Sequence, residues 1–157
     1  MVSHVLDANV FITAHRDYYP PDRVPQFWDW LSIQATAGAI KVPLPIWDEI
    51  ERVYNPLKDW QHAHKAVFVI EDASADARLG GILDLYATDL AEDEILRIGA
   101  DPFLAAYAQE LGAKVVTKEV SKPTCQRANK RLPDICTQCR VPWITDHILI
   151  RELDFKA

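Results

Sequence analysis

The sequence predicts an α/β protein built on a mostly parallel sheet with helices on both faces. Short apolar runs rich in β-branched residues alternate along the chain with longer segments of helical periodicity, and Pro or Gly residues separate the two kinds of segment. Such alternation favours right-handed crossovers between parallel strands. Neither an internal repeat nor a long linker divides the 157 residues, so we expect a single domain over 1–157.

Local signals define the expected elements. Apolar runs of strand length predict strands, and Pro and Gly residues mark where helices begin and end, as Pro45 and Gly112 do. The first strand is expected to end at Asp7, and the others to cover 40–44, 113–117 and 141–145. Helices are expected over about 25–37, 45–54, 101–111, 133–139 and 147–153, with two or three more within 58–90, divided weakly at Gly80-Gly81. Irregular loops are expected at 15–27 and 121–133.

The charge balance limits how the protein can bind nucleic acid. Lys and Arg number 17 against 23 Asp and Glu, which gives a formal charge of −6. Bulk electrostatic binding to phosphates needs a basic protein, so a role on nucleic acid would require a local basic patch, a metal ion or a basic partner. The N-terminus lacks the basic region of a signal peptide, and no apolar run approaches the roughly 18 residues of a membrane span. We therefore expect no membrane association, reduced cysteines and a cytoplasmic location.

Four acidic residues stand where ligands are expected to bind such a sheet. Asp7 and Glu119 fall at the carboxyl ends of expected strands, and Glu49 and Asp101 lie on helices that follow loops from that edge. Parallel α/β sheets bind their ligands beyond the carboxyl ends of the strands. The four carboxylates are therefore expected to converge there.

A divalent metal ion would explain this convergence. Carboxylates within about 4–6 Å of one another repel by several kcal/mol in a partly desolvated cleft, and a cation removes that cost. Oxygen ligands without His or Cys suit Mg²⁺ or Mn²⁺, which would polarise a phosphodiester. Asn9, expected on the same side of the strand as Asp7, and Thr117 could support the site. Each acid alone is also explained as a turn, cap or solvated helix residue, so the metal site rests on the whole set.

Several motifs carry a family resemblance. VLDANVFI around Asp7, the helix with Glu49, GADPFLAAYA around Asp101 and VVTKE ending at Glu119 follow one another in this order and spacing. Together they resemble the PIN-domain nucleases, in which an Asp closes the first strand and the later motifs supply three further acids. YYPPDRVPQFWDWL and LPDIC extend the likeness to a bacterial PIN-like subfamily of toxin type, over nearly the whole chain. Most relatives carry Asp at the position of Glu119, and Asp48 is an alternative to Glu49.

The resemblance implies a three-layer α/β/α PIN-like fold with a mostly parallel central sheet. It also implies a Mg²⁺- or Mn²⁺-dependent endoribonuclease, the toxin of a toxin–antitoxin pair, whose metal ligands and catalytic residues are Asp7, Glu49, Asp101 and Glu119. A cognate antitoxin is the expected partner, with a basic segment that fits an acidic groove, and homodimers are common among similar proteins. The side chain of Glu119 is one methylene longer than that of the usual Asp, which is expected to affect the rate of the reaction more than its class.

Two loops on the same expected edge supply candidate RNA contacts. Their basic side chains could bind phosphates, and Tyr18 and Tyr19 could stack on unpaired bases. The candidate phosphate contacts are Arg16, Arg23, Lys118, Lys122, Lys130 and Arg131. Asp134, which follows Pro133 at a helix start, is a candidate helix cap or supporting residue of the metal site. An irregular spacing argues against a zinc site made of Cys125, Cys136, Cys139 and His147.

Two other functions stay open on the sequence alone. An aspartate-nucleophile phosphatase also has a strand that ends in Asp-x-Asp, but Asn9 occupies the position of the second Asp, which protonates the leaving group. A PIN-like scaffold that binds RNA or protein without turnover is compatible with Glu119 and with the acidic charge. Metal titration distinguishes this scaffold from an enzyme, because a site that binds no metal gives no Mn²⁺-linked gain in stability.

Overall fold

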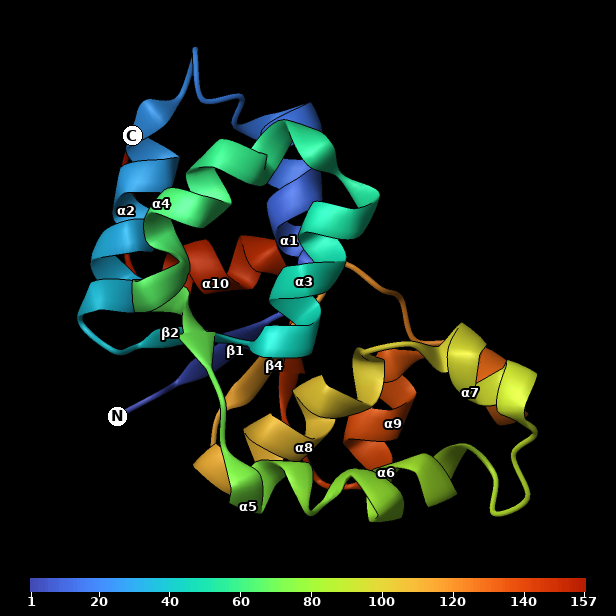
Figure 1. The fold of residues 1–157 in the computed structure, drawn as a ribbon. Coiled ribbons are helices and arrows are strands. Elements are labelled where there is room, and N and C mark those ends of the chain that lie inside the picture. The colour runs from blue at the N-terminus through green and yellow to red at the C-terminus, as the bar shows by residue number, and fades with distance from the viewer.

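Five parallel strands form the central sheet. A computed structural model describes all residues 1–157. The strands are β1 (His4–Leu6), β2 (Ile40–Pro43), β3 (Val69–Ile70), β4 (Lys114–Val116) and β5 (Trp143–Ile144). They pair in the order β3-β2-β1-β4-β5, and every neighbouring pair is parallel (Figure 1). The expected α/β class is confirmed, and the strands expected at 40–44, 113–117 and 141–145 are present in shorter form.

Helices cover both faces of this sheet. They are α1 (Ala8–Thr13), α2 (Pro25–Thr36), α3 (Leu44–Val53), α4 (Lys58–Phe68), α5 (Ala73–Asp76), α6 (Leu79–Tyr86), α7 (Glu92–Ile98), α8 (Asp101–Leu111), α9 (Leu132–Gln138) and α10 (Asp146–Glu152). Figure 1 shows α1, α2, α4 and α10 on one side of the strands and α5, α6, α8 and α9 on the other, which confirms the three layers. None of these helices has the length and apolar character needed to span a membrane.

The hydrophobic core fills the space on both faces of the sheet. On one face the ring of Phe11 packs edge-on against Trp47 and Phe68, with ring centroids 5.9 and 5.8 Å apart. On the other face α8 buries Leu104 and Tyr107 completely. Full burial of a side chain of this size contributes roughly 1.5–3 kcal/mol. The two packed faces hold the strand ends, and thus the loops at the carboxyl edge, in fixed positions.

The first strand ends at Leu6, one residue before its expected end, and a helix follows it directly. The Asp7 side chain accepts a 2.7 Å hydrogen bond from the Ala8 N–H and caps α1, so a helix begins directly after β1. Asn9 therefore lies on this helix and not on the strand, and its expected strand-face relation to Asp7 is wrong. A short apolar run does not by its periodicity distinguish a buried helix from a strand, and Val10 and Phe11 are buried here as helix residues.

The middle of the chain holds the other differences. β3 follows α4 within a segment expected to be only helical, and α7 was not expected. Gly80 and Gly81 do not separate two helices, because both lie inside α6. A helical glycine costs about 1 kcal/mol relative to Ala, and the burial of Ile82 and Tyr86 from the same helix exceeds that cost.

Candidate functional site

Three acidic side chains meet at the carboxyl edge of the sheet. Asp7 follows β1, Glu119 lies just beyond β4, and Asp101 is the first residue of α8. The two strands are neighbours, and the Asp7 N–H donates to the Val116 carbonyl at 2.9 Å, which places the residues after them side by side. One carboxylate oxygen from each of Asp7, Asp101 and Glu119 lies within 4.8 Å of the others. The expected convergence of these three acids is confirmed.

A hydrogen-bond network centred on Thr117 orients the cluster. Its fully buried hydroxyl donates to Asp7 Oδ2 at 2.8 Å and accepts from the Glu119 N–H at 3.1 Å. The same oxygen accepts from Asn9 Nδ2 at 3.3 Å, and Asn9 Oδ1 accepts from the Lys118 N–H at 3.1 Å. A hydroxyl has one proton and two lone pairs, so these contacts use the whole capacity of the Thr117 side chain and fix Asp7 relative to Glu119.

Burial and mutual repulsion make the cluster resist carrying its full negative charge. Burial, together with the charges of Glu119 and Glu49, raises the pKa of Asp7 to about 7, although the hydrogen bond from Thr117 acts in the opposite direction. Burial and then the charge of Asp7 raise the pKa of Asp101 well above its ordinary value. Burial also raises the pKa of Glu119, and the nearby Arg131 opposes that change. A proton or a cation bound at the cluster therefore relieves an unfavourable charge.

This electrostatic state predicts how stability depends on pH in EDTA. The folded protein keeps the Asp7 proton up to a pH of about 7, whereas the unfolded chain releases it near the ordinary pKa of 3.8. Between these values the folded state holds the extra proton, so the free energy of unfolding should fall by on the order of a few kcal/mol as the pH rises. Urea unfolding between pH 5 and 8 measures the slope. Asp7→Asn should flatten it, and an unchanged slope in that variant would show that other groups cause it.

Glu49 lies beside the three acids without joining their closest contacts. It projects from α3 and lines a hollow of about 380 Å³ together with Asp7, Asp101 and Glu119. Burial raises the pKa of Glu49, and Arg52, whose nearest nitrogen is 3.8 Å away, opposes that change. Its neighbour Asp48 is exposed and lines a different hollow. Of the two alternatives on this helix, Glu49 is thus the one that faces the cluster.

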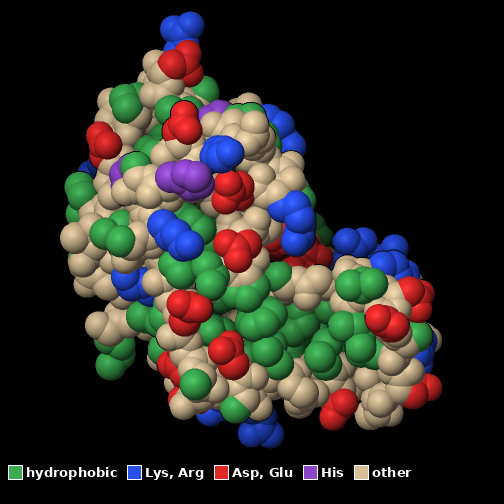
Figure 2. All heavy atoms as spheres, viewed as in Figure 1, with side chains coloured by type: hydrophobic (Ala, Val, Ile, Leu, Met, Phe, Trp, Pro, Cys, Tyr) green, Lys and Arg blue, Asp and Glu red, His purple; other side chains and the backbone are tan.

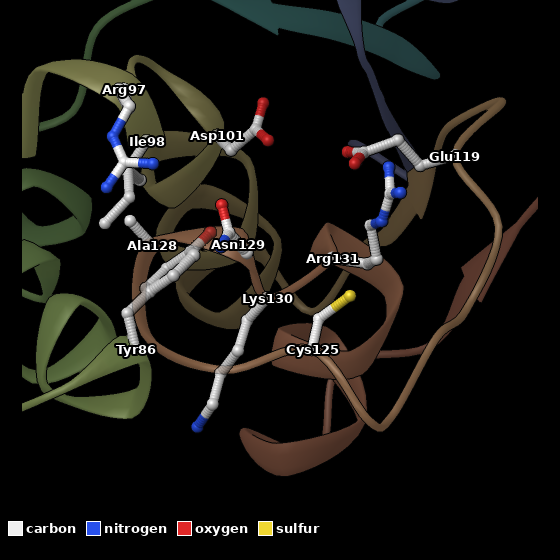
Figure 3. Close-up of a pocket in the computed structure, with 10 residues that line it drawn as sticks. All are labelled: Tyr86, Arg97, Ile98, Asp101, Glu119, Cys125, Ala128, Asn129, Lys130 and Arg131. Carbon is white, nitrogen blue, oxygen red and sulfur yellow. The ribbon is translucent and has the colours of Figure 1, made fainter. Parts of the chain in front are cut away.

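Asp101 and Glu119 form a wall between two hollows. The one that contains Glu49 also includes Asn9 and Arg16, and a second one of about 470 Å³ lies on the side of α6 and α7. Figure 3 shows the carboxylates of Asp101 and Glu119 facing each other across the mouth of the second hollow, with Arg131 reaching toward Glu119. In Figure 2 acidic atoms lie deep in a recess that has basic side chains on both sides.

Only some of the basic side chains expected to bind RNA are placed to do so. Arg16 and Arg131 line the two hollows, although Arg16 also pairs with Asp17. Lys118 is largely buried, where its Nζ lies 2.9 Å from Asp146 Oδ1. Lys130 donates to the Leu85 carbonyl at 2.7 Å and points away from the acids (Figure 3). The ammonium groups of Lys118 and Lys130 are therefore engaged in contacts that stabilise the fold.

Two further candidates lie on the exposed parts of the loops. Arg23 is exposed and pairs with Asp22 at 3.5 Å, and the exposed Lys122 donates its backbone N–H to Asp134 at 2.8 Å. Arg23 lines none of the hollows described around the acids, whereas Lys122 shares a third hollow with Glu119. Of these two, only Lys122 is placed near an acid of the cluster.

Asp134 and the cysteines do not add to the cluster. Asp134 lies in the first turn of α9, where its carboxylate accepts from the Ser121 hydroxyl and the Lys122 N–H, so it holds the preceding loop. The cap position of that helix belongs to Arg131. The expected helix cap at Asp134 is therefore wrong, and its expected supporting role at the metal site stays a prediction. The three cysteines are free thiols, and neither they nor His147 belong to the group of possible metal ligands.

The fold and the site define a class of protein. It is a three-layer α/β protein with a partly buried carboxylate cluster at the carboxyl edge of a parallel sheet. The chain belongs to the family described as "Domain of unknown function (DUF4411)", whose model matches residues 4–157. A comparison with curated proteins gave no match. The family description gives no activity, so the resemblance to PIN-domain nucleases stays a prediction.

Proposed function

We propose that the protein is a metal-dependent endoribonuclease that hydrolyses RNA phosphodiesters at the cluster of Asp7, Asp101 and Glu119, with Glu49 beside it. The observation that carries the proposal is the approach of three carboxylates to within 4.8 Å of one another with no ion pair to any of them. Structural carboxylates in a partly buried position are normally compensated by a basic partner. Here no basic group forms an ion pair with any of the three, and Arg131 beside Glu119 (Figure 3) offsets only part of their charge.

The donor set fits Mg²⁺ or Mn²⁺. All three close ligand groups are carboxylates, and hard oxygen ligands select these ions over zinc. Burial, and after it the charges of neighbouring carboxylates, raise the pKa values of Asp7 and Asp101, so the ionised cluster favours a bound cation. A bound divalent ion neutralises this charge and polarises the oxygens of a phosphodiester.

The residues around the cluster have distinct parts in this proposal. Thr117 and Asn9 fix the orientation of Asp7 and of the Glu119 backbone. Arg16 and Arg131, which line the hollows on opposite sides of the acids, are positioned to contact the phosphates that flank the scissile one. The net charge of −6 makes these local contacts more important than long-range attraction.

Cleavage of a mixed RNA pool that includes tRNA tests the proposal. The purified protein should cut RNA with Mn²⁺ or Mg²⁺, and EDTA or Asp7→Asn should abolish the cutting. Asp48→Asn is a matched control, because this exposed acid lies one residue before Glu49 and outside the cluster. Absence of cutting by the folded protein in both metals would contradict the proposal. A scaffold without turnover would in addition show no Mn²⁺-linked gain in stability.

The contacts of Asn9 argue against the phosphatase alternative. Its amide nitrogen donates to Thr117 and its amide oxygen accepts from the Lys118 N–H. An amide has no acidic proton to give, so Asn9 cannot protonate a leaving group as the second Asp of that motif would, and its two contacts give it a role within the fold. Hydrolysis of a small phosphoester by a protein that does not cut RNA would reverse this assignment.

We also propose that the enzyme is a toxin controlled by an antitoxin. An apolar groove of about 660 Å³ between α3, α7 and α8 supports a partner of this kind. Its residues Ile95 and Leu96 are exposed, and Figure 2 shows hydrophobic side chains gathered on the face of the molecule that it displays. The groove adjoins the site, because Gly99 at its border faces Glu49. A purified complex with the antitoxin should have lost RNA cleavage, and a fully active complex would contradict this role.

A further inference from the structure

The hollow on the side of α6 contains a polar atom without a partner. The Tyr86 side chain is 3% exposed and lines this hollow, yet its hydroxyl forms no hydrogen bond with any other group of the protein. Figure 3 shows the ring rising from α6 with the hydroxyl directed into the hollow, next to Asn129. Buried hydroxyls are nearly always paired, and each exception calls for an explanation. A ligand that reaches this hydroxyl would provide the missing hydrogen bond.

The other walls specify the chemistry of that ligand. Ile98 and Ala128 give the hollow apolar sides, and Asn129 adds an amide that both donates and accepts. Arg97 and Arg131 stand at the rim, and neither forms an ion pair. A flat, partly apolar ring with polar edges fits the interior, and an anionic group attached to it fits the rim.

The position of the hollow links it to the proposed reaction. Asp101 and Glu119 belong to its wall and also to the acidic cluster, so a ligand inside it lies directly beside the place of the scissile phosphate. Of the basic groups nearby, Arg127 pairs with Asp89 and Glu94 and is not free for a phosphate. This leaves the two rim arginines for the adjoining phosphate.

We propose that this hollow binds the unpaired nucleoside next to the scissile phosphate, with the edge of its base on the Tyr86 hydroxyl and the Asn129 amide. Arg97 and Arg131 then hold the phosphate attached to that nucleoside. The inference rests on the proposed nuclease function and adds to it a preference for the base beside the cut. A base that enters the hollow must leave its stack, which is easiest in a single-stranded region.

Binding in EDTA tests this inference without metal and without cleavage. The four ribonucleosides and their 5′-monophosphates are titrated into the full-length protein and followed by NMR. One nucleoside should bind best, and Tyr86→Phe should weaken its binding about 3- to 10-fold, which corresponds to one hydrogen bond. Its monophosphate should bind more tightly, and Arg131→Gln should remove that gain. Equal binding of all four nucleosides by Tyr86→Phe and the wild type would overturn the inference.

Tyr107→Phe is the matched control. Its hydroxyl donates to Asp76 at 2.7 Å and lies outside the hollow, so this variant should lose stability and keep nucleoside binding. Tyr86→Phe should show the opposite pattern, because it removes a hydroxyl that has no partner in the fold. A Tyr86→Phe protein that loses stability and binds nucleosides like the wild type would assign the hydroxyl a structural role and overturn the inference.

The outcomes separate this inference from the proposed function. Nucleoside binding that depends on Tyr86, in a protein that cuts no RNA in either metal, would support nucleoside binding in the hollow and contradict the proposed nuclease function. Metal-dependent cutting that shows no preference for the adjoining base, and that is as fast in Tyr86→Phe as in the wild type, would support the nuclease function. It would overturn the proposal that a base binds in the hollow.

Discussion

An Asp101→Asn protein is expected to lose metal-dependent RNA cleavage by about 10³-fold or more. The amide removes one negative charge from the three carboxylates that approach within 4.8 Å, and with it a strong ligand for a hard cation. A metal ion contributes several kcal/mol to the stabilisation of charge in the transition state, and each 1.36 kcal/mol corresponds to a tenfold change in rate. The variant should fold normally, because Asn retains the shape of Asp.

The same variant should be more stable than the wild type in EDTA. The pKa of Asp101 is raised by burial and by Asp7, so at neutral pH the charged form is unfavourable and its removal relieves repulsion. In Mn²⁺ the order should reverse, because only the wild type gains about 2.7 kcal/mol at a metal concentration 100 times Kd. Urea unfolding with and without Mn²⁺ measures both effects. Asp84→Asn, an exposed acid on α6, serves as the control. An Asp101→Asn protein that kept the full Mn²⁺ gain would remove Asp101 from the metal site.

A Thr117→Val substitution is expected to destabilise the protein by about 2–4 kcal/mol, since a buried hydrogen-bond network is broken. Valine keeps the volume of the side chain but leaves Asp7 Oδ2 without its donor and the Glu119 N–H without its acceptor. Because the hydrogen bond from Thr117 opposes the rise in the pKa of Asp7, its loss should raise that pKa further. Metal affinity at neutral pH should then fall as well.

Thr117→Ser distinguishes the effect of losing the hydroxyl from the effect of losing the methyl group. Serine retains the donor to Asp7 and the acceptor for Asn9 and Glu119, so it should lose only about 1 kcal/mol from the deleted methyl and keep the metal affinity. Urea unfolding and Mn²⁺ titration of the two variants give the comparison. Equal losses in both would assign the effect to packing and not to the hydrogen bonds.

The carboxylate cluster could be predicted from the sequence because it depends on strand order alone. Once Asp7 and Glu119 are placed at the ends of parallel strands, the topology brings them to one edge whatever the exact bounds of the elements are. Asp101 follows because its proline-initiated helix begins at that edge. Glu49 and Asp48 could not be separated in this way, because the rotation of α3 about its axis decides which of them faces inward.

The supporting contacts could not be predicted because they arise from the tertiary arrangement. The place of Asn9 required knowledge that Asp7 starts a helix, which a run of apolar residues does not reveal. From the sequence Lys118 is expected to be a solvated loop cation, but in the structure it forms an ion pair with Asp146. Tyr86 carries no local signal, since a buried tyrosine on a helix face is usually a core residue, and only the missing partner of its hydroxyl marks it.

The pairing of β1 with β4 has a consequence for how the chain folds. Asp7 and Thr117 are 110 positions apart, so the central strand β1 is synthesised well before its neighbour β4. Joining segments so distant along the chain carries a large loop-closure entropy and slows folding. A nascent chain that has not reached β4 exposes one edge of β1 and has not yet brought its acidic groups together. The acidic cluster, and with it the proposed cleavage activity, therefore requires a chain that extends at least through Glu119.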